Sequence, residues 1–237
     1  MPSKKAAPAA KTPGGLPDQA LAQLEATLSR CPPAFAQDVR DVLAMDHLTW
    51  TVLDEVKEIT PAWRPSTQAV LITGDLHIDG NVLVKPTQAH DDAYLIVLGA
   101  VRARNLIVGD GAAFLCAGAL TAQEAIVCTA MRSVTQVAGD VQAQLLDSGH
   151  GAWMDVFDKA QIAAVQHLSS YVMVAGSPHS PEEDADLTEL LIEDVQDTEE
   201  WDELDPEEQA EEKAADYVGL DKQKAFALLA KGQSILV

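Results

Sequence analysis

The sequence predicts a mainly β protein with flanking helices, built around a right-handed parallel β-helix (solenoid) of about four to five coils. Three observations predict this fold. A glycine-centred motif recurs four times within residues 70–147, its apolar positions keep one spacing in every copy, and the side chains suit a narrow core. Hydrophobic residues make up 47% of the chain but aromatic residues only 5%, so small and branched aliphatic side chains dominate.

The repeat is marked by Gly74, Gly99, Gly118 and Gly139, which lie 25, 19 and 21 positions apart. This spacing is typical of stacked solenoid coils. In each copy the residues two before, two after and four after the glycine are apolar, and alternate residues of a strand share one face. The columns expected to face the core comprise Ile72, Val97, Cys116 and Val137, then Leu76, Val101, Leu120 and Val141, then Ile78, Ala103, Ala122 and Ala143.

One coil cannot bury its own apolar face, whereas stacked coils do. An antiparallel β-sandwich also places strands at short intervals. The column match across four copies favours the solenoid, which we assign to residues 67–177. Beyond the fourth copy, residues 159–170 suit either a strand pair or a short helix, and Tyr171–Val174 is expected to be a strand of one degenerate coil.

The part before the solenoid divides into a tail and a helical block. Residues 1–17, rich in Pro, Ala, Lys and Gly, are expected to form a disordered tail. Apolar residues recur at helical spacing in 18–29, 33–44 and 48–59, so residues 18–66 are predicted to form helices. Because this block leads directly into the first coil, we expect it to cover the open end of the solenoid.

The composition changes sharply near residue 181. Residues 181–212 carry 17 of the 37 acidic side chains of the chain and no Lys or Arg. An apolar stripe at helical spacing nevertheless runs through this stretch: Leu187, Leu190, Leu191 and Val195. The stripe favours folded helices with an acidic face over a disordered acidic tail. Residues 178–237 are therefore predicted to form an acidic helical region, with further helices from about residue 205 and over 221–231, and a closing strand at 234–237.

The charge and the cysteines limit the class of partner and the compartment. The formal net charge is −21, which argues against direct binding to nucleic acid or anionic lipid and favours basic partners; added solubility alone is the alternative. No apolar run is long enough to span a membrane, and the N-terminus lacks the apolar centre of a secretory signal. Cys31, Cys116 and Cys128 show no metal-ligand spacing and are expected to be reduced thiols of a cytoplasmic protein.

No constellation of residues indicates catalysis, so no catalytic residue, metal site or cofactor is predicted. The six histidines are scattered and form no HxH or HExxH pair, and the chain has neither a nucleophile elbow nor a phosphate loop. His77 and Asp79 are expected on the outer face of one coil with Asp75 beside them, so a metal site is conceivable there. An exposed histidine beside acidic residues is more often only part of the surface.

Two strings, LITGDLHIDG at 71–80 and YLIVLGAVRARNLIV at 94–108, resemble a group of bacterial β-solenoid proteins described as polymer-forming-like. Many of these look like immunity proteins of polymorphic or type VI secretion toxins. The string ALLAKGQSIL at 227–236 is similar to the final helix and strand of that group. Ala100 and Ala119 stand where the group commonly has Asp. The shared motif is scaffold, so the resemblance implies the solenoid and carries over no functional residue.

The resemblance implies an immunity protein that binds and neutralises a cognate secreted toxin. A nuclease toxin presents a basic surface to its phosphate substrate, and a rigid acidic protein is able to occupy that surface and to associate quickly by electrostatic steering. We expect the contact on the acidic segment, with Trp201 and Leu204 as apolar anchors within a charged rim. Its residues are Glu193, Asp194, Asp197, Glu199, Glu200, Trp201, Asp202, Glu203, Leu204 and Asp205. Packing of Trp201 against the solenoid is an equally weighted alternative.

Two other classes stay open. A bactofilin-like filament requires exposed terminal coils, and both the predicted helical blocks and the self-repulsion of a chain of charge −21 argue against it. A solenoid enzyme has less support, because solenoid acyltransferases carry a hexapeptide repeat that this chain lacks.

Overall fold

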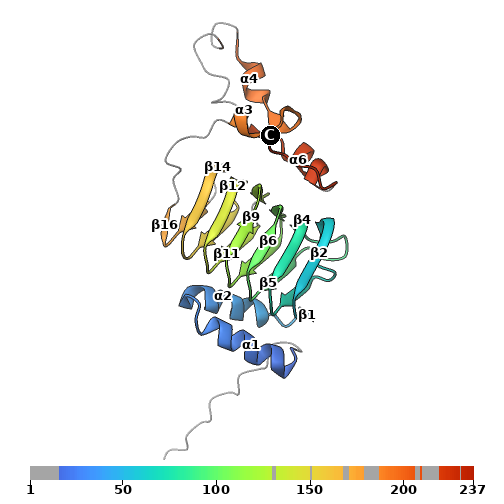
Figure 1. Ribbon diagram of the computed structural model, residues 1–237, viewed down its shortest axis with the longest axis vertical. Coiled ribbons are helices and arrows are strands. Elements are labelled where there is room, and N and C mark those ends of the chain that lie inside the picture. The colour runs from blue at the N-terminus through green and yellow to red at the C-terminus, as the bar shows by residue number, and fades with distance from the viewer. Residues whose placement is uncertain are drawn as a thin grey trace, which may run out of the picture.

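The described residues form a parallel β-solenoid of about six turns, with helices on two opposite sides (Figure 1). The computed structural model describes residues 16–129, 132–149, 151–167, 171–178, 187–205, 209, 219–229 and 231–237. The predicted fold class, a mainly β protein with a parallel solenoid, is confirmed. The predicted tail and the helix expected beyond residue 205 lie largely outside the described residues, although Leu16 is buried.

The first sheet supplies one side of each coil. Its strands are β1 Trp50–Leu53, β3 Ala69–Ile72, β5 Ala93–Val97, β8 Ala112–Cys116, β11 Val134–Val137, β13 Trp153–Val156 and β15 Tyr171–Val174. They pair in this order and in parallel, and the short β16, Ser177–Pro178, adds an antiparallel edge to β15. Each strand therefore belongs to a successive turn of the chain.

The second sheet bends to form the other two sides of the coil. Four strands run along both sides: β2 Val56–Trp63, β4 Leu76–Val84, β12 Val141–Ser148 and β14 Ala160–His167. In two coils the strand is divided, into β6 Val101–Ala103 and β7 Asn105–Val108, and into β9 Leu120–Ala122 and β10 Ala125–Cys128. The start of β4 pairs with β6 and its end with β7, so each coil is three-sided.

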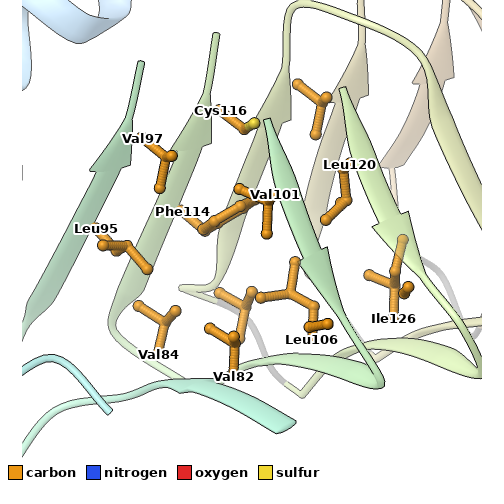
Figure 2. Packing of buried hydrophobic residues seen from close by; sticks show 14 of the residues in the cluster. Val82, Val84, Leu95, Val97, Val101, Leu106, Phe114, Cys116, Leu120 and Ile126 are labelled. Carbon is orange, nitrogen blue, oxygen red and sulfur yellow. The ribbon is translucent and has the colours of Figure 1, made fainter. Parts of the chain in front are cut away.

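The predicted inward columns form the core of the solenoid. Every member of the three columns is at most 6% exposed and belongs to a single cluster. Figure 2 shows register partners of adjacent coils stacked within it, such as Val97 with Cys116 and Val101 with Leu120. Since one coil cannot bury its own apolar side chains, it is the in-register stacking of coils that removes the columns from water.

The repeated glycines mark the place where consecutive coils approach most closely. Gly118 donates its N–H to the carbonyl oxygen of Gly99 at 3.2 Å, and Gly99 donates to Gly74 at 3.0 Å. A Cβ atom on Gly118 would lie 2.5 Å from that oxygen of Gly99, and one on Gly139 would lie 2.8 Å from the carbonyl carbon of Gly118. The motif therefore requires glycine for space between backbones, and its φ angle is not the cause.

The first coil is formed by a segment for which the sequence predicted a helix. Residues 48–59 have apolar residues at helical spacing, but they form β1 and the start of β2. Val52, Val56 and Ile59 are β-branched, a composition that suits strands, and pairing with β3 and β4 decides the outcome. The solenoid therefore begins near Trp50; this coil and the coil of β13 (Trp153–Val156) and β14 (Ala160–His167) add to the four that carry the motif.

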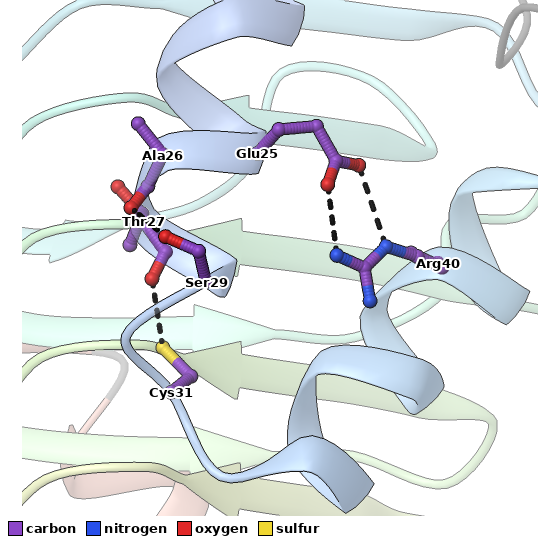
Figure 3. Close-up of polar contacts among 6 residues, drawn as sticks. All are labelled: Glu25, Ala26, Thr27, Ser29, Cys31 and Arg40. Atoms are coloured by element: carbon purple, nitrogen blue, oxygen red, sulfur yellow. Dashed lines mark hydrogen bonds and ion pairs between the residues drawn. The ribbon is translucent and has the colours of Figure 1, made fainter.

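Helices α1, Asp18–Leu28, and α2, Pro33–Leu43, form a hairpin close to the predicted bounds. Figure 3 shows the two-point ion pair between Glu25 and Arg40 that links them, with a shorter N–O distance of 2.8 Å. Contrary to the expectation, the hairpin does not cover an open end but packs on the outer face of the first sheet. Ile96 and Leu115 point outward from that face, and the helices remove them from water.

The C-terminal region covers the outer face of the third side. Its elements are α3 Leu187–Leu190, the 3-10 turn Glu193–Val195, β17 Gln196–Asp197, α4 Glu199–Glu203, β18 Gly219–Leu220 and α6 Lys222–Leu229. Leu191 and Leu229 pack against the outward side chains Leu83, Ile107 and Val127 of the solenoid. The runs at 82–84 and 106–108 are apolar on both faces because one face lines the core and the other is covered by this region.

A buried asparagine pair joins this region to the solenoid. Asn105 donates through Nδ2 to Asn81 Oδ1 at 2.9 Å, and its Oδ1 accepts the N–H of Ala125 at 2.8 Å. Asn81 in turn donates to the carbonyl oxygen of Leu229, and Arg104 donates to that of Gly232 at 2.9 Å. Asn81 thus adds a second donor to the last carbonyl of α6, which also accepts the N–H of Gly232, and Arg104 bonds to the turn that follows the helix.

We predict that Gly118→Ala lowers the free energy of unfolding by about 1–3 kcal/mol, because the added methyl group forces adjacent backbones apart. Urea unfolding followed by circular dichroism measures the loss. Ala119→Ser is the matched control, since Ala119 is the exposed neighbour. Equal stability of the Gly118→Ala protein would contradict the close approach of the coils.

We predict that Asn105→Ala lowers the free energy of unfolding by about 2–4 kcal/mol, because the buried Asn81 oxygen and the Ala125 N–H lose their partner. The loss should include faster hydrogen exchange in α6, which is tied to the pair through Asn81. The control is Gln123→Ala, a change at an exposed position. Unchanged exchange in α6 would show that the asparagine pair does not hold the C-terminal region.

Candidate partner-binding surfaces

The acidic segment predicted as a contact surface lies in the C-terminal region, over the 3-10 turn, β17 and α4. Its apolar stripe turns inward, since Leu191 and Val195 are buried in the cluster that covers the solenoid. The carboxylates turn outward: Glu193, Asp194, Asp197, Glu199, Asp202, Glu203 and Asp205 are all exposed. The segment is therefore a folded acidic surface.

The predicted anchors lie at α4, which sits on the side of this region away from the solenoid (Figure 1). Leu204 is half-buried, and Asp202 accepts a hydrogen bond from the Thr198 hydroxyl at 3.0 Å. Glu200 and Trp201 belong to α4, but their side chains lie outside the described part of the chain. The structure thus leaves the role of Trp201 as a prediction.

A second surface, which the sequence did not point to, is a groove of about 520 Å³ between α2 and the outer face of the first sheet. We call it the α2 groove. Asp38, Asp41, Val42 and Met45 of α2 form one wall. The floor is formed by residues of four strands and of the turns before them: Asp92, Tyr94, Gly111, Ala112, Ala113, Leu115, Arg132, Val134, Gln136, Trp153 and Asp155. Its volume lies in the range of roughly 300–1,000 Å³ that is usual for ligand sites.

Two aromatic side chains border the groove. Trp153 is 42% exposed, and its indole N–H donates to Asp155 Oδ2 at 2.6 Å, which fixes the ring. Tyr94 is half-buried, and burial together with the nearby Asp92 carboxylate raises the pKa of its phenol. The Tyr94 hydroxyl therefore stays neutral at physiological pH and contributes no negative charge.

The groove carries a strongly negative lining. Among the described residues, four carboxylates line it, Asp38, Asp41, Asp92 and Asp155, against one cation, Arg132. Arg132 makes two bonds of 3.3 Å to the carboxylate of Asp110, and this pairing lowers the pKa of Asp110. Arg132 also interacts with Asp92, but Asp110 adds a further carboxylate beside it, so the net charge at the groove stays negative.

Gln136 is the least usual residue of the lining. It is only 6% exposed, and its Nε2 donates to Asp38 Oδ2 at 2.8 Å. Because a carboxylate accepts but does not donate, the donor end of the amide must face Asp38, and the carbonyl end faces elsewhere. That buried Oε1 atom has no hydrogen-bond partner among the described residues. An unpartnered buried acceptor costs free energy and calls for an explanation.

The sequence contains a signal for this groove in one outward column of the repeat. The residue three before each repeat glycine points outward under the helix hairpin, and in the first three copies it is Leu71, Ile96 and Leu115. In the fourth copy it is Gln136, and its register partner in the next coil is Asp155. The column changes from apolar to polar here while still lying under α2, because Gln136 bonds to Asp38 and Phe35 of α2 contacts Phe157 of the next coil.

The conceivable metal site is not assembled in the structure. Asp75 Oδ1 accepts the N–H of Ala100 from the next coil at 2.7 Å, so this carboxylate caps the backbone. His77 lies in register between Lys57 and Arg102, and such cationic neighbours disfavour a bound cation. Among the described residues, no group of three or more His, Cys, Asp or Glu side chains is placed to hold a metal ion.

The core cysteine of the repeat is held as a thiol. Burial raises the pKa of the Cys116 thiol to about 12, so it is protonated at neutral pH. Since the thiolate is the nucleophilic form, Cys116 serves as a packing residue of the core.

Comparisons with protein-family models, curated proteins and solved structures found no match to this chain. In the described part of the structure, no helix is long and apolar enough to cross a membrane. The two acidic surfaces are therefore the features that bear on function.

We predict that Gln136→Met raises the free energy of unfolding by about 1 kcal/mol, because it removes a buried oxygen without a partner while keeping the side-chain volume. The lost bond to Asp38 costs little, since Asp38 is partly accessible to water. Urea unfolding measures the change, with Gln142→Met at an exposed position as the control. A clear destabilisation would mean that Gln136 is a structural residue.

Proposed function

We propose that the protein is an immunity protein of the cytoplasm, which binds a secreted toxin domain and neutralises it by covering a basic active-site surface. The observation that carries the proposal is the exposed row of carboxylates in residues 193–205, a stretch without Lys or Arg, on a folded region packed against a solenoid. A nuclease is the toxin class that fits best, because its phosphate-binding surface must be basic. The resemblance of the repeat to immunity solenoids supports the same class.

The rigidity of the scaffold supports tight binding. The C-terminal region is fixed to the solenoid by apolar packing, by the bond of Asn81 to Leu229 at the end of α6, and by the bond of Arg104 to Gly232 beyond it. A charged surface that is already ordered loses little entropy on binding, so more of the interaction energy appears as affinity. Opposite charges on the two partners also increase the association rate.

A filament is the alternative, and the first coil argues against it. End-to-end stacking would pair the edge of β2 with β14 of another copy, but Pro61 lies within β2 and has no N–H to donate. Lys57 and Glu58 are exposed on the same strand, and charged side chains discourage pairing between edges. Gly232 also packs against Pro61, where a Cβ atom would lie 2.7 Å from that of the proline.

The proposal is tested by capture of the partner with the tagged full-length protein at moderate salt. The expected partner is one stoichiometric basic protein that, once released in denaturant and refolded, cleaves DNA or RNA and loses this activity when the pure protein is added. Large assemblies of the protein alone would support the filament, and a captured partner without toxin activity would contradict the immunity function.

We predict that neutralising Glu199, Asp202, Glu203 and Asp205 to Gln or Asn slows association with that partner by about tenfold or more and flattens its salt dependence. The control neutralises an equal number of exposed carboxylates near the first coil: Asp54, Glu55, Glu58 and Asp79. Both variants change the net charge equally, so stopped-flow rates at several salt concentrations separate local contact from overall charge. Equal slowing by the two variants would move the contact away from α4.

A further inference from the structure

The α2 groove has the shape of a slot for one long side chain and the backbone that carries it. Tyr94 and Trp153 stand in the same outward row of the first sheet, separated by Ala113 and Val134. Because neighbouring strands are about 4.8 Å apart, the two aromatic residues are about 14 Å apart along the sheet. The small residues between them keep the floor low, while α2 forms the long wall.

The chemistry of the lining selects a cation that donates hydrogen bonds. Asp38, Asp41, Asp92 and Asp155 would repel a phosphate or a carboxylate. Asp38 and Asp155 flank Gln136, the first through a hydrogen bond and the second as its register partner. The Gln136 carbonyl oxygen, buried and without a partner among the described residues, is a further acceptor. All three residues line the groove, and each has an oxygen that can accept a hydrogen bond.

A guanidinium group matches this set better than an ammonium group. It is planar, presents several N–H donors in a fixed fork, and remains charged at any physiological pH. It also stacks on aromatic rings, and the exposed Trp153 ring is fixed beside Asp155 by its own N–H bond. A lysine ammonium carries its charge at one point and would satisfy fewer of these acceptors at once.

We propose that the α2 groove binds an arginine side chain on an extended segment of a basic partner protein, with Asp38, Asp155 and the Gln136 carbonyl as acceptors and Trp153 as the stacking surface. The inference rests on the proposed function only in taking the partner to be a basic protein. Helices α2 and α4 lie on opposite sides of the solenoid (Figure 1), so a partner that also contacts α4 must reach the groove with a loop or tail.

The test uses the intact ¹⁵N-labelled protein and a capped peptide, acetyl-Ala-Arg-Ala-Arg-Ala-amide. Its matched control peptide has citrulline, the neutral isostere, in place of each arginine. The chain has four tryptophans, and the indole N–H signals of Trp153 and Trp201 are identified with the variants Trp153→Phe and Trp201→Phe. Each of the two candidate surfaces therefore contains its own reporter. We expect the arginine peptide to shift the Trp153 signal in a saturable way and the citrulline peptide to leave it unchanged.

Two charge-matched variants then locate the site. Asp38→Asn with Asp155→Asn removes two charges but keeps an oxygen that accepts from Gln136 and from the Trp153 indole. This variant should weaken the peptide by about tenfold, judged by the charge-assisted bonds it loses. Asp202→Asn with Glu203→Gln removes the same charge from α4 and should leave the affinity unchanged. The backbone spectrum of each variant checks that the fold is kept.

Three results would overturn the inference: a shift of Trp201 in place of Trp153, equal shifts with the citrulline peptide, or undiminished affinity after the Asp38 and Asp155 changes. These results would leave the capture of a basic toxin unaffected. Conversely, binding of the arginine peptide in the groove would stand even if the captured partner were not a toxin. The two proposals therefore fail separately.

Discussion

The structure depends on the in-register stacking of coils whose backbones meet at the glycine column. Each coil buries its side chains only against its neighbours, so every later feature relies on a constant register. The contacts from Gly74 to Gly99 and from Gly99 to Gly118 leave no space for a side chain, and this fixes the coils at their closest approach. The same register sets Gln136 beside Asp155 and aligns Tyr94 with Trp153, so the groove is a consequence of the repeat.

Two faces of the solenoid are apolar on the outside, and another part of the chain packs on each of them. The hairpin of α1 and α2 covers Ile96 and Leu115, and the C-terminal region covers Ile107 and Val127. Where an outward residue under α2 becomes polar, at Gln136, it bonds to Asp38 and contributes to the lining of the groove. The acidic residues thus occur on elements that are held in place by apolar packing, and a charged surface of this kind can be both exposed and rigid.

Much of the fold was predictable, because the inward columns of the repeat are a local pattern with a single period. The first coil was not, since residues 48–59 have helical spacing and only pairing with β3 and β4 makes them strands. The position of the helix hairpin was also wrong, because sequence order does not tell which face a helix covers. The groove was not predicted, although the outward column of Leu71, Ile96, Leu115 and Gln136 changes from apolar to polar at its last member. That change can be interpreted only when it is known that α2 packs over this column.

The central claim is that this solenoid presents acidic surfaces to a basic protein, and hydrogen exchange of the complex with its captured partner tests it most directly. The account predicts slower exchange over residues 193–205 and in α2, β11 and β13 around the groove, with β2 unchanged. Protection confined to the edge strands β2 and β14 would contradict the account, because it would show that the ends of the solenoid, and not its acidic sides, make the contact.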